Sequence, residues 1–348
     1  MRVFFSEQHR EHDPQVFLSR GQIKPCPEVP RRADILSQSL GDAGFVLDPP
    51  REFPDSAITR VHDAEYLKFL QTAWQEWTQL GDFAAEIVPN VHPNRHMQGL
   101  PDAIVGRAGY YQADTACPIG PGTWRAARAS VDVALSAASV VMSEGEADFA
   151  YALCRPPGHH ACADMAGGFC FLNNTAIATQ YCLDQGADRV AIVDVDVHHG
   201  NGTQQIFYTR DDVLTVSLHG DPAVYYPFYL GYAGETGAKR GAGFNVNVPM
   251  PEGTGDDVYL VALDDVLDRV RGFSPDVLVV ALGLDASEHD GHHPFFRIST
   301  DGFARITGRL AALELPTVLI QEGGYVSDFL GANIAAALQG FETVHGAP

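Results

Sequence analysis

The chain of 348 residues contains no stretch of about 18 uninterrupted apolar residues, the length that a membrane-spanning helix needs. We therefore expect no transmembrane segment. The first ten residues, MRVFFSEQHR, hold no long apolar run and no small-residue cleavage site, so we expect no signal peptide and a cytoplasmic location. Repeats and low-complexity tracts are also lacking.

Basic residues are scarce, since 23 Lys and Arg stand against 44 Asp and Glu and the formal net charge is −21. A surface of this sign repels nucleic acid and attracts cations. No basic run and no alternation of basic with aromatic residues points to DNA or RNA. We therefore expect no nucleic-acid partner, and the charge serves either solubility or the attraction of cationic substrates.

Cysteine pairs with metal-binding spacing are missing, because none of the six cysteines forms a C-x-x-C pair. This usage is typical of reduced, buried thiols in a cytoplasmic protein. Zinc binding through cysteine remains the less favoured alternative.

Apolar strand-like runs alternate with helical patterns through most of the chain. Several runs consist almost entirely of Val, Ile, Leu and Ala, as expected for parallel strands buried on both faces. The alternation predicts an α/β fold with a single doubly wound, mostly parallel sheet and helices on both faces. The expected strands are 2–5, 149–153, 190–194, 213–217, 244–248, 277–282 and 317–321. The expected helices are 31–43, 63–77, 122–143, 173–184, 255–270, 300–313 and 327–339.

Residues 78–121 break this rhythm, because they are rich in Gly, Pro, His and Asn and show little periodicity. A structureless loop of this length is unusual inside a compact domain. We expect the segment to be functional or to form contacts, with a surface excursion without a role as the alternative.

Metal-binding residue types follow two of the predicted strands. Asp196 and His198 lie in DVDVHHGNGT after one strand, and Asp285 lies in LGLDAS after another. Ligands of open α/β sheets bind at the carboxyl ends of the strands, and alternate residues of a strand share a face. Three protein ligands with an open fourth position are typical of a catalytic zinc site. The alternative is that these residues cap helices and hold loops. Asp194 is expected to orient a histidine or to bind a monovalent cation with nearby carbonyls.

Acid–base residue types follow two further strands. The turn PPG places His159 and His160 next to each other, and the pair could supply one base and one charged stabiliser. Tyr325 follows Glu-Gly-Gly and could donate its hydroxyl to a developing oxyanion. A pair of surface histidines and a packed tyrosine are the alternatives.

Eight stretches together resemble the histone deacetylase superfamily, which has the arginase/deacetylase fold, and within it the bacterial acetylpolyamine amidohydrolases. They are VHDAEYLKFL, LCRPPGHHA, GGFCFLNN, DVDVHHGNGTQ, SLHGDP, LGYAGETG, LGLDAS and EGGY. The resemblance covers nearly the whole chain and implies that residues 1–348 form a single catalytic domain. It also implies a zinc-dependent amide hydrolase, with Fe²⁺ as an alternative metal.

The resemblance implies a role for each polar residue at the strand ends. Asp196, His198 and Asp285 match the zinc ligands. His160 matches the general base that activates water and then protonates the leaving amine. His159 matches its cationic partner, which pairs with Asp194, and Tyr325 polarises the substrate carbonyl.

Further sites follow from the same resemblance. Phe169, Tyr226 and Gly168 match the walls of a substrate tunnel, with ordinary core packing as the alternative for the two aromatic residues. A structural K⁺ site is implied at Asp194, Asp196, His198, Ser217 and Leu218. A second cation site, lined by carbonyl groups, is implied at Phe207, Arg210 and Val213.

Two departures from the family pattern bear on mechanism and substrate. Asn201 stands where many members have an aspartate beside the second histidine, so we expect a lower pKa for His160. Ala116 and Val105 stand where polyamine-selective relatives have acids at the tunnel mouth. Asp114, Glu288 and Asp290 could compensate, and the rim could instead be lined by His289, His292 and His293.

The segment 78–121 matches the insertion with which acetylpolyamine enzymes dimerise and narrow the active-site mouth. The resemblance therefore implies a homodimer that deacetylates small N-acyl amines. A hydrolase of another small natural or xenobiotic amide and a protein lysine deacetylase are the enzyme alternatives. A non-catalytic acyl-ligand binder is the alternative from another class, and an arginase-type dimanganese enzyme would need more ligands than the sequence offers.

Overall fold

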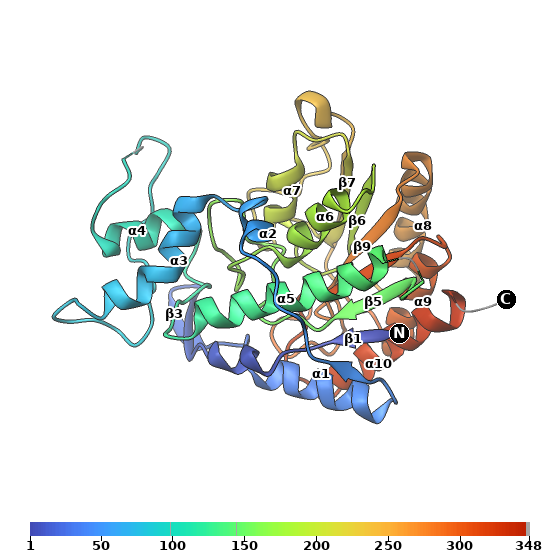
Figure 1. Cartoon of the computed structure of the whole chain (residues 1–348), viewed down its shortest axis with the longest axis horizontal. Helices are drawn as coiled ribbons and strands as arrows, with labels where there is room; N and C mark the ends of the chain where they lie inside the picture. Colours follow the sequence, from blue (N-terminus) through green and yellow to red (C-terminus); the bar gives the residue numbers. More distant parts are fainter. Residues whose placement is uncertain (98, 144, 346–348) are drawn as a thin grey trace.

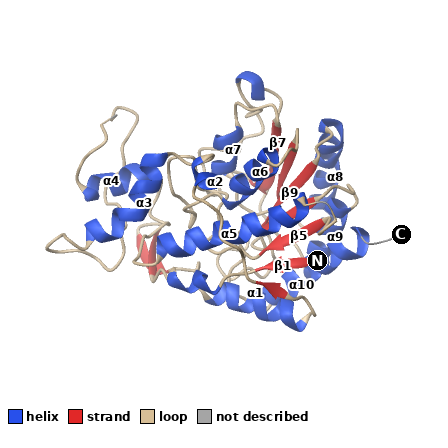
Figure 2. Cartoon of the chain, in the orientation of Figure 1, coloured by secondary structure: helices blue, strands red, loops and turns tan. Residues whose placement is uncertain are grey.

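A computed structural model of the chain describes residues 1–97, 99–143 and 145–345. Its centre is a sheet of eight strands in which every pairing is parallel (Figures 1 and 2). The predicted α/β class is confirmed, and the sheet is wholly parallel where a mostly parallel one was expected. In spatial order the strands are β4 (Leu47–Asp48), β1 (Arg2–Phe4), β5 (Phe149–Ala152), β10 (Thr317–Gln321), β9 (Val277–Leu282), β6 (Val190–Asp194), β7 (Val213–Gly220) and β8 (Asn245–Met250).

Helices cover both faces of the sheet, and the strand residues alternate between two cores. In β9, Val277 and Val279 pack into one cluster while Leu278 and Val280 pack into the other. Because both faces are buried, the central strands read as unbroken apolar runs. One face is covered by α5 (Thr123–Met142) and α6 (Asn174–Asp184), and the other by α1 (Arg31–Asp42), α8 (Asp256–Phe273), α9 (Thr300–Ala311) and α10 (Leu330–His345). Among the residues described, no helix combines the length and the apolar character that crossing a membrane requires.

Several short elements were not predicted. An antiparallel hairpin joins β2 (Val16–Ser19) to β3 (Gln22–Pro25), and its turn residues Arg20 and Gly21 have φ angles of 52° and 74°. Positive φ at both positions is typical of a type I′ hairpin turn. The remaining short elements are the strand β4 and the helices η1 (Glu7–Glu11), α2 (Ser56–Thr59), α4 (Ile104–Tyr111), α7 (Asn201–Phe207) and η2 (Lys239–Gly241).

The segment 78–121 is not structureless, and it forms contacts of its own. It follows α3 (Ala64–Trp77), contains α4 and projects from the body of the molecule at the left of Figure 1. Ile87 and Ile119 exchange backbone hydrogen bonds of 2.9 and 3.1 Å, and both side chains are buried in a third apolar cluster. The buried residues with helical spacing are confined to the short helix α4, which contributes Ile104, Ala108 and Tyr111.

Candidate metal centre

The four strands that carry the candidate residues are the four central neighbours of the sheet, β5, β10, β9 and β6. Their carboxyl ends deliver the histidine pair, Tyr325, Asp285 and the Asp196–His198 segment, respectively. Residues from four distant parts of the chain therefore meet at one edge of one sheet.

Asp196, His198 and Asp285 form a compact donor group whose ligand atoms all lie within 4.8 Å of one another. The Nδ1 atom of His198 is 3.1 Å from Asp196 Oδ1 and 3.2 Å from Asp285 Oδ2. Among the residues described, Asp285 Oδ2 is buried without a hydrogen-bond partner. A buried carboxylate oxygen without a donor is costly, and a bound cation would remove that cost. Two carboxylates and one imidazole therefore fit a divalent metal ion.

The geometry of the two ligands on β6 comes from a bend and not from the strand itself. The strand ends at Asp194, so the alternation of side chains that predicted a common face does not extend to Asp196 and His198. Instead, the amide of Asp196 donates to Asp194 Oδ1 (3.1 Å) and the amide of His198 donates to Asp196 Oδ1 (2.8 Å). These local bonds fold the segment so that both ligands face Asp285.

Two glycines leave the space that the carboxylates occupy. A Cβ atom at Gly283 would overlap the carboxylate of Asp196, and one at Gly323 would overlap those of Asp196 and Asp285. The amide of Gly323 also donates to Asp196 Oδ2 over 2.8 Å. The glycine of LGLDAS and the first glycine of EGGY are therefore required by close packing.

The electrostatics of the donor group favour positive charge. Burial opposes the charge of Asp196, but His159 and His198 outweigh it and hold the pKa of this carboxyl below its usual range. Burial likewise opposes the charge of His198, but the neighbouring carboxylates of Asp196 and Asp285 raise its pKa to about 9. The centre therefore attracts a cation.

The adjacent histidines have different partners. His159 Nδ1 lies 2.9 Å from Asp194 Oδ2, whereas His160 Nδ1 lies 2.7 Å from Asn201 Oδ1. Burial opposes the charge of His159, but Asp194 and Asp196 outweigh it and raise its pKa well above the usual value. Burial and the nearby charge of His159 lower the pKa of His160 well below the usual value. The pair is thus split into a cationic and a neutral imidazole.

The backbone of the histidine pair is held by Glu322, a residue that the sequence analysis did not single out. Its Oε2 atom accepts the amides of Gly158 (2.6 Å) and His159 (3.0 Å). Burial raises the pKa of Glu322 to about 7. This carboxyl therefore links the EGGY loop to the PPGHH turn by hydrogen bonds. The only sequence feature that could have indicated Glu322 is its position next to the two glycines of EGGY.

Tyr325 follows the two glycines of the EGGY loop and is buried. The guanidinium of Arg32 lies 4.9 Å from the centroid of its ring, and Asp290 Oδ2 accepts its amide over 2.9 Å. Burial and the charge of Asp285 raise the pKa of Tyr325 well above its usual value. The phenol therefore keeps its proton and can donate it in a hydrogen bond.

A pocket of about 510 Å³ connects these residues to solvent. The predicted tunnel residues Phe169, Tyr226 and Gly168 all line it, and so do His160, His198 and Tyr325. The sequence analysis missed two of its walls: the β2–β3 hairpin and Tyr225, whose ring stacks on His198 at 4.9 Å. The complete set of lining residues is Phe17, Leu18, Ser19, Arg20, Asp114, Thr115, Ala116, His160, Gly168, Phe169, His198, Val224, Tyr225, Tyr226, Phe228, Glu252, His292, His293, Phe295 and Tyr325.

The carboxylates at the pocket differ from those proposed at the mouth. Glu288 does not line the pocket. The Asp290 carboxylate accepts hydrogen bonds from the backbone amides of Tyr325, His292 and His293. Asp114 does line it, and Glu252 is a lining acid that the sequence analysis missed.

Ala116 lines the pocket and packs against Phe169, whereas Val105 lies in α4 away from it. Of the three candidate rim histidines, His292 and His293 line the pocket. His289 instead stacks on Phe329 at 4.0 Å.

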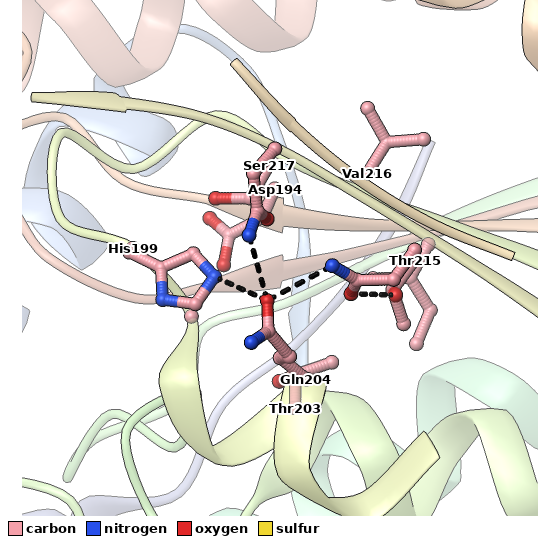
Figure 3. A pocket seen from close by; sticks show the side chains of 11 residues that line it. Asp194, His199, Thr203, Gln204, Thr215, Val216 and Ser217 are labelled. Atoms are coloured by element: carbon pink, nitrogen blue, oxygen red, sulfur yellow. Dashed lines mark hydrogen bonds between the residues drawn. The ribbon is translucent and has the colours of Figure 1, made fainter. Parts of the chain in front are cut away.

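The residues expected at the K⁺ sites lie around β6, α7 and β7. Asp194 and Ser217 are paired in register, and both line an enclosed cavity of about 10 Å³ (Figure 3). Gln204 also lines this cavity, and its Oε1 atom accepts hydrogen bonds from Asn245 and Asn247. Leu218 follows in β7, while Phe207 ends α7, Val213 begins β7 and Arg210 lies in the turn between them.

The donor group lies beside one cationic and one neutral histidine and a protonated tyrosine, at the carboxyl ends of parallel strands. This combination is typical of a metal-dependent hydrolase of the α/β class. The sequence profile of the histone deacetylase domain matches residues 26–341. The chain belongs to the histone deacetylase family and is an amide hydrolase of that family.

Relatives in this family match nearly the full chain. Acetylpolyamine amidohydrolase 1 of Pseudomonas aeruginosa is 48% identical over 350 residues, covering 98% of this chain and 99% of that protein. The acetylpolyamine amidohydrolase of Mycoplana ramosa is 43% identical, covering 98% of this chain and 99% of that protein. A crystal structure of acetylpolyamine aminohydrolase from Burkholderia pseudomallei matches with a TM-score of 0.94 at 43% identity, covering 99% of both chains.

Proposed function

We propose that the protein is a zinc-dependent amidohydrolase that deacetylates small N-acyl amines, such as acetylated polyamines and diamines. The observation that carries this proposal is the donor group Asp196–His198–Asp285, which shares one aromatic-walled pocket with His160 and Tyr325. The names of the full-length relatives support the substrate class. Fe²⁺ would suit the same donor group.

The metal ion held by Asp196, His198 and Asp285 would act as a Lewis acid on the substrate carbonyl and on the attacking water. The chain itself supplies the remaining chemistry.

His160 acts as the general base and then as the general acid. Asn201 Nδ2 donates to the carbonyl of His160 (3.5 Å), so its oxygen faces Nδ1 of the imidazole. Nδ1 therefore carries the proton, and Nε2 is free to take one from water and to pass it to the leaving amine. The lowered pKa of His160 keeps this imidazole neutral and ready at neutral pH.

His159 and Tyr325 stabilise charge. His159 stays cationic because Asp194 holds it, and it supplies positive potential next to the base. Tyr325 donates its hydroxyl to the oxyanion that forms when water adds to the amide carbon.

A structural K⁺ is part of the proposal, with Asp194, Asp196, His198, Ser217 and Leu218 as its ligands, some of them through backbone oxygens. The small cavity beside Asp194 and Ser217 supports it, because about 10–15 Å³ suffices for a water-sized particle. A second cation would take carbonyl groups of Phe207, Arg210 and Val213.

We also propose that residues 1–348 act as one catalytic domain, that the segment 78–121 forms a homodimer and that the enzyme works in the cytoplasm. Exposed apolar side chains on that segment, including Phe83, Val91 and Leu100, support the dimer. All six cysteines are free, which supports a reducing compartment. A clean monomer in size-exclusion chromatography with light scattering would contradict the dimer.

A hydrolase of another small amide is the second candidate. Ala116 gives the mouth an apolar surface, and neither Glu288 nor Asp290 offers a free carboxylate to the pocket. A substrate without a distal ammonium group would suit this surface better.

Asp285→Ala tests the proposed metal centre. The variant should lose zinc, measured by elemental analysis, together with acetate release from acetylated diamines. Asp257→Ala is the matched control, because the Asp257 side chain is 92% exposed and should change neither quantity. Full zinc content in Asp285→Ala would contradict the assignment of this ligand.

A further inference from the structure

Asp114 holds two separate walls of the substrate pocket. Its Oδ2 atom accepts the hydroxyl of Tyr226 over 2.6 Å and the amide of Gly168 over 3.1 Å. Its Oδ1 atom accepts the amide of Ala116 over 2.8 Å. A single carboxylate from the segment 78–121 thus bonds to two groups that are 58 residues apart along the chain (168 to 226).

Both groups that Asp114 holds border the imidazole of His160. The Tyr226 ring lies 5.0 Å from the His160 ring at an interplanar angle of 89°. Gly168 has a φ of 51°, and a Cβ atom there would overlap both the His160 ring and the Tyr226 hydroxyl. The His160 imidazole is therefore bordered by two residues, Tyr226 and Gly168, that both donate hydrogen bonds to Asp114.

Backbone hydrogen bonds fix the segment around Asp114 to the same wall. The amide of Ala113 donates to the carbonyl of Ala166 over 2.7 Å, and the amide of Phe169 donates to the carbonyl of Ala116 over 3.2 Å. These bonds lie on either side of Asp114, so its carboxylate is held in place by the main chain.

The donors around Asp114 argue against its use as a ligand for a substrate ammonium group. Both carboxylate oxygens already accept hydrogen bonds from Tyr226, Gly168 and Ala116. Glu252, in contrast, lines the same pocket, is exposed and makes no side-chain hydrogen bond to the described residues.

We propose that Asp114 is a positioning residue for the hydrolysis, acting through the Tyr226 hydroxyl and the Gly168 amide to hold the tunnel walls against His160. This role rests on the proposed function, in which His160 is the base and acid. It links the projecting segment to the reacting groups without contact between Asp114 and the substrate.

Asp114→Ala should lower kcat by at least about tenfold, since small displacements of reacting groups can cost up to about 10²-fold. KM should change little. The decrease in kcat should be equal for an acetylated diamine and for a neutral N-alkyl acetamide, because Asp114 does not contact the substrate in this proposal. Asp114→Asn should recover part of the loss, because one oxygen can still accept the Tyr226 hydroxyl. Asp102→Ala, an exposed acid of the same segment, is the control and should match the wild type.

A double-mutant cycle separates this role from a general structural one. Because Asp114 acts through Tyr226, the Asp114→Ala/Tyr226→Phe variant should lose less than the product of the two single losses. Additive losses would overturn the proposal, as would a rise in KM confined to the cationic substrate.

Calorimetric binding of an alkyl hydroxamate to the zinc-loaded variants gives a readout besides turnover. Asp114→Ala should weaken binding severalfold while its zinc content stays at the wild-type level, and unchanged binding would overturn the proposal. If the wild type hydrolyses no acyl amine, the proposed function fails, and hydroxamate binding alone still decides the role of Asp114.

Discussion

At the scale of single residues, the histidine pair shows how partners divide one residue type into two functions. His159 and His160 are both buried and adjacent, so burial alone would lower the pKa of each. Asp194 supplies a negative charge to the first ring, whereas Asn201 supplies only an uncharged oxygen to the second. The sequence analysis expected a lower pKa for His160 because Asn201 replaces an aspartate, but burial and the charge of His159 are what lower this pKa, and the hydrogen bond with Asn201 acts in the opposite direction.

Asn201→Asp tests this division. A carboxylate beside Nδ1 would attract positive charge and raise the pKa of His160. Because the base must be neutral, the acidic limb of the kcat/KM profile should move to higher pH. Asn90→Asp, an exposed control, should leave the profile unchanged. An unshifted acidic limb in Asn201→Asp would count against His160 as the titrating base.

Tyr325→Phe tests the oxyanion donor. The change removes one hydroxyl and keeps the ring against Arg32 and Phe169. We expect kcat to fall by about 10²–10³-fold, the usual effect of losing one such donor. Zinc content by elemental analysis should stay at the wild-type level. A wild-type turnover rate in this variant would rule out the proposed role.

At the scale of elements, the sequence predicted the parts of the fold that are fixed by burial. Strands β5, β6, β9 and β10 could be predicted because their apolar runs are short and alternate with helical patterns, as is typical of parallel strands buried on both faces. Their ends located the donor group before its geometry was known, because parallel strands end at one edge.

Other elements could not be predicted, for physical reasons. The hairpin β2–β3 is four residues per strand with several exposed apolar side chains, so no clean alternation marks it. The bend after Asp194 depends on side-chain bonds to the backbone, which a periodicity argument does not contain. The contacts of Asp114 could not be predicted because its partners Gly168 and Tyr226 are far away in sequence.

Gly323→Ala tests the loop after β10. The added methyl group would overlap the carboxylates of Asp196 and Asp285 and force them apart. We expect the affinity for zinc, measured by titration calorimetry, to fall by at least about 10–100-fold. Gly272→Ala in α8 is the control, because nothing lies within 4 Å of its Cβ position. Equal zinc affinity in the two variants would show that the loop does not shape the metal centre.

At the scale of the whole molecule, the sheet and the projecting segment contribute different residues to the same pocket. The four central strands bring the metal ligands, the histidine pair and Tyr325 to one edge. The segment 78–121 adds Asp114 and Ala116 to the pocket wall and carries α4 away from the sheet (Figure 1). The sheet therefore supplies the reacting groups, while the segment and the hairpin β2–β3 supply walls of the pocket around them.

The net charge of −21 bears on the same question. A negative surface raises the local concentration of cationic substrates and repels anionic ones. Glu252 brings one exposed carboxylate to the pocket, while Arg20 brings one positive charge to the same rim. The rim therefore carries charges of both signs, so charge alone does not determine the proposed preference for an acylated diamine over a peptide.

The most direct test of the account is the ratio of kcat/KM values for acetylputrescine or acetylcadaverine and for an acetyl-lysine peptide. Both are measured by acetate release from the zinc-loaded enzyme. We predict a preference of at least about tenfold for the acetylated diamine, because the family resemblance implies that the segment 78–121 narrows the mouth against the bulkier substrate. An equal or greater rate for the peptide, or poor turnover of both substrates with zinc bound, would contradict the assignment as a deacetylase of small N-acyl amines.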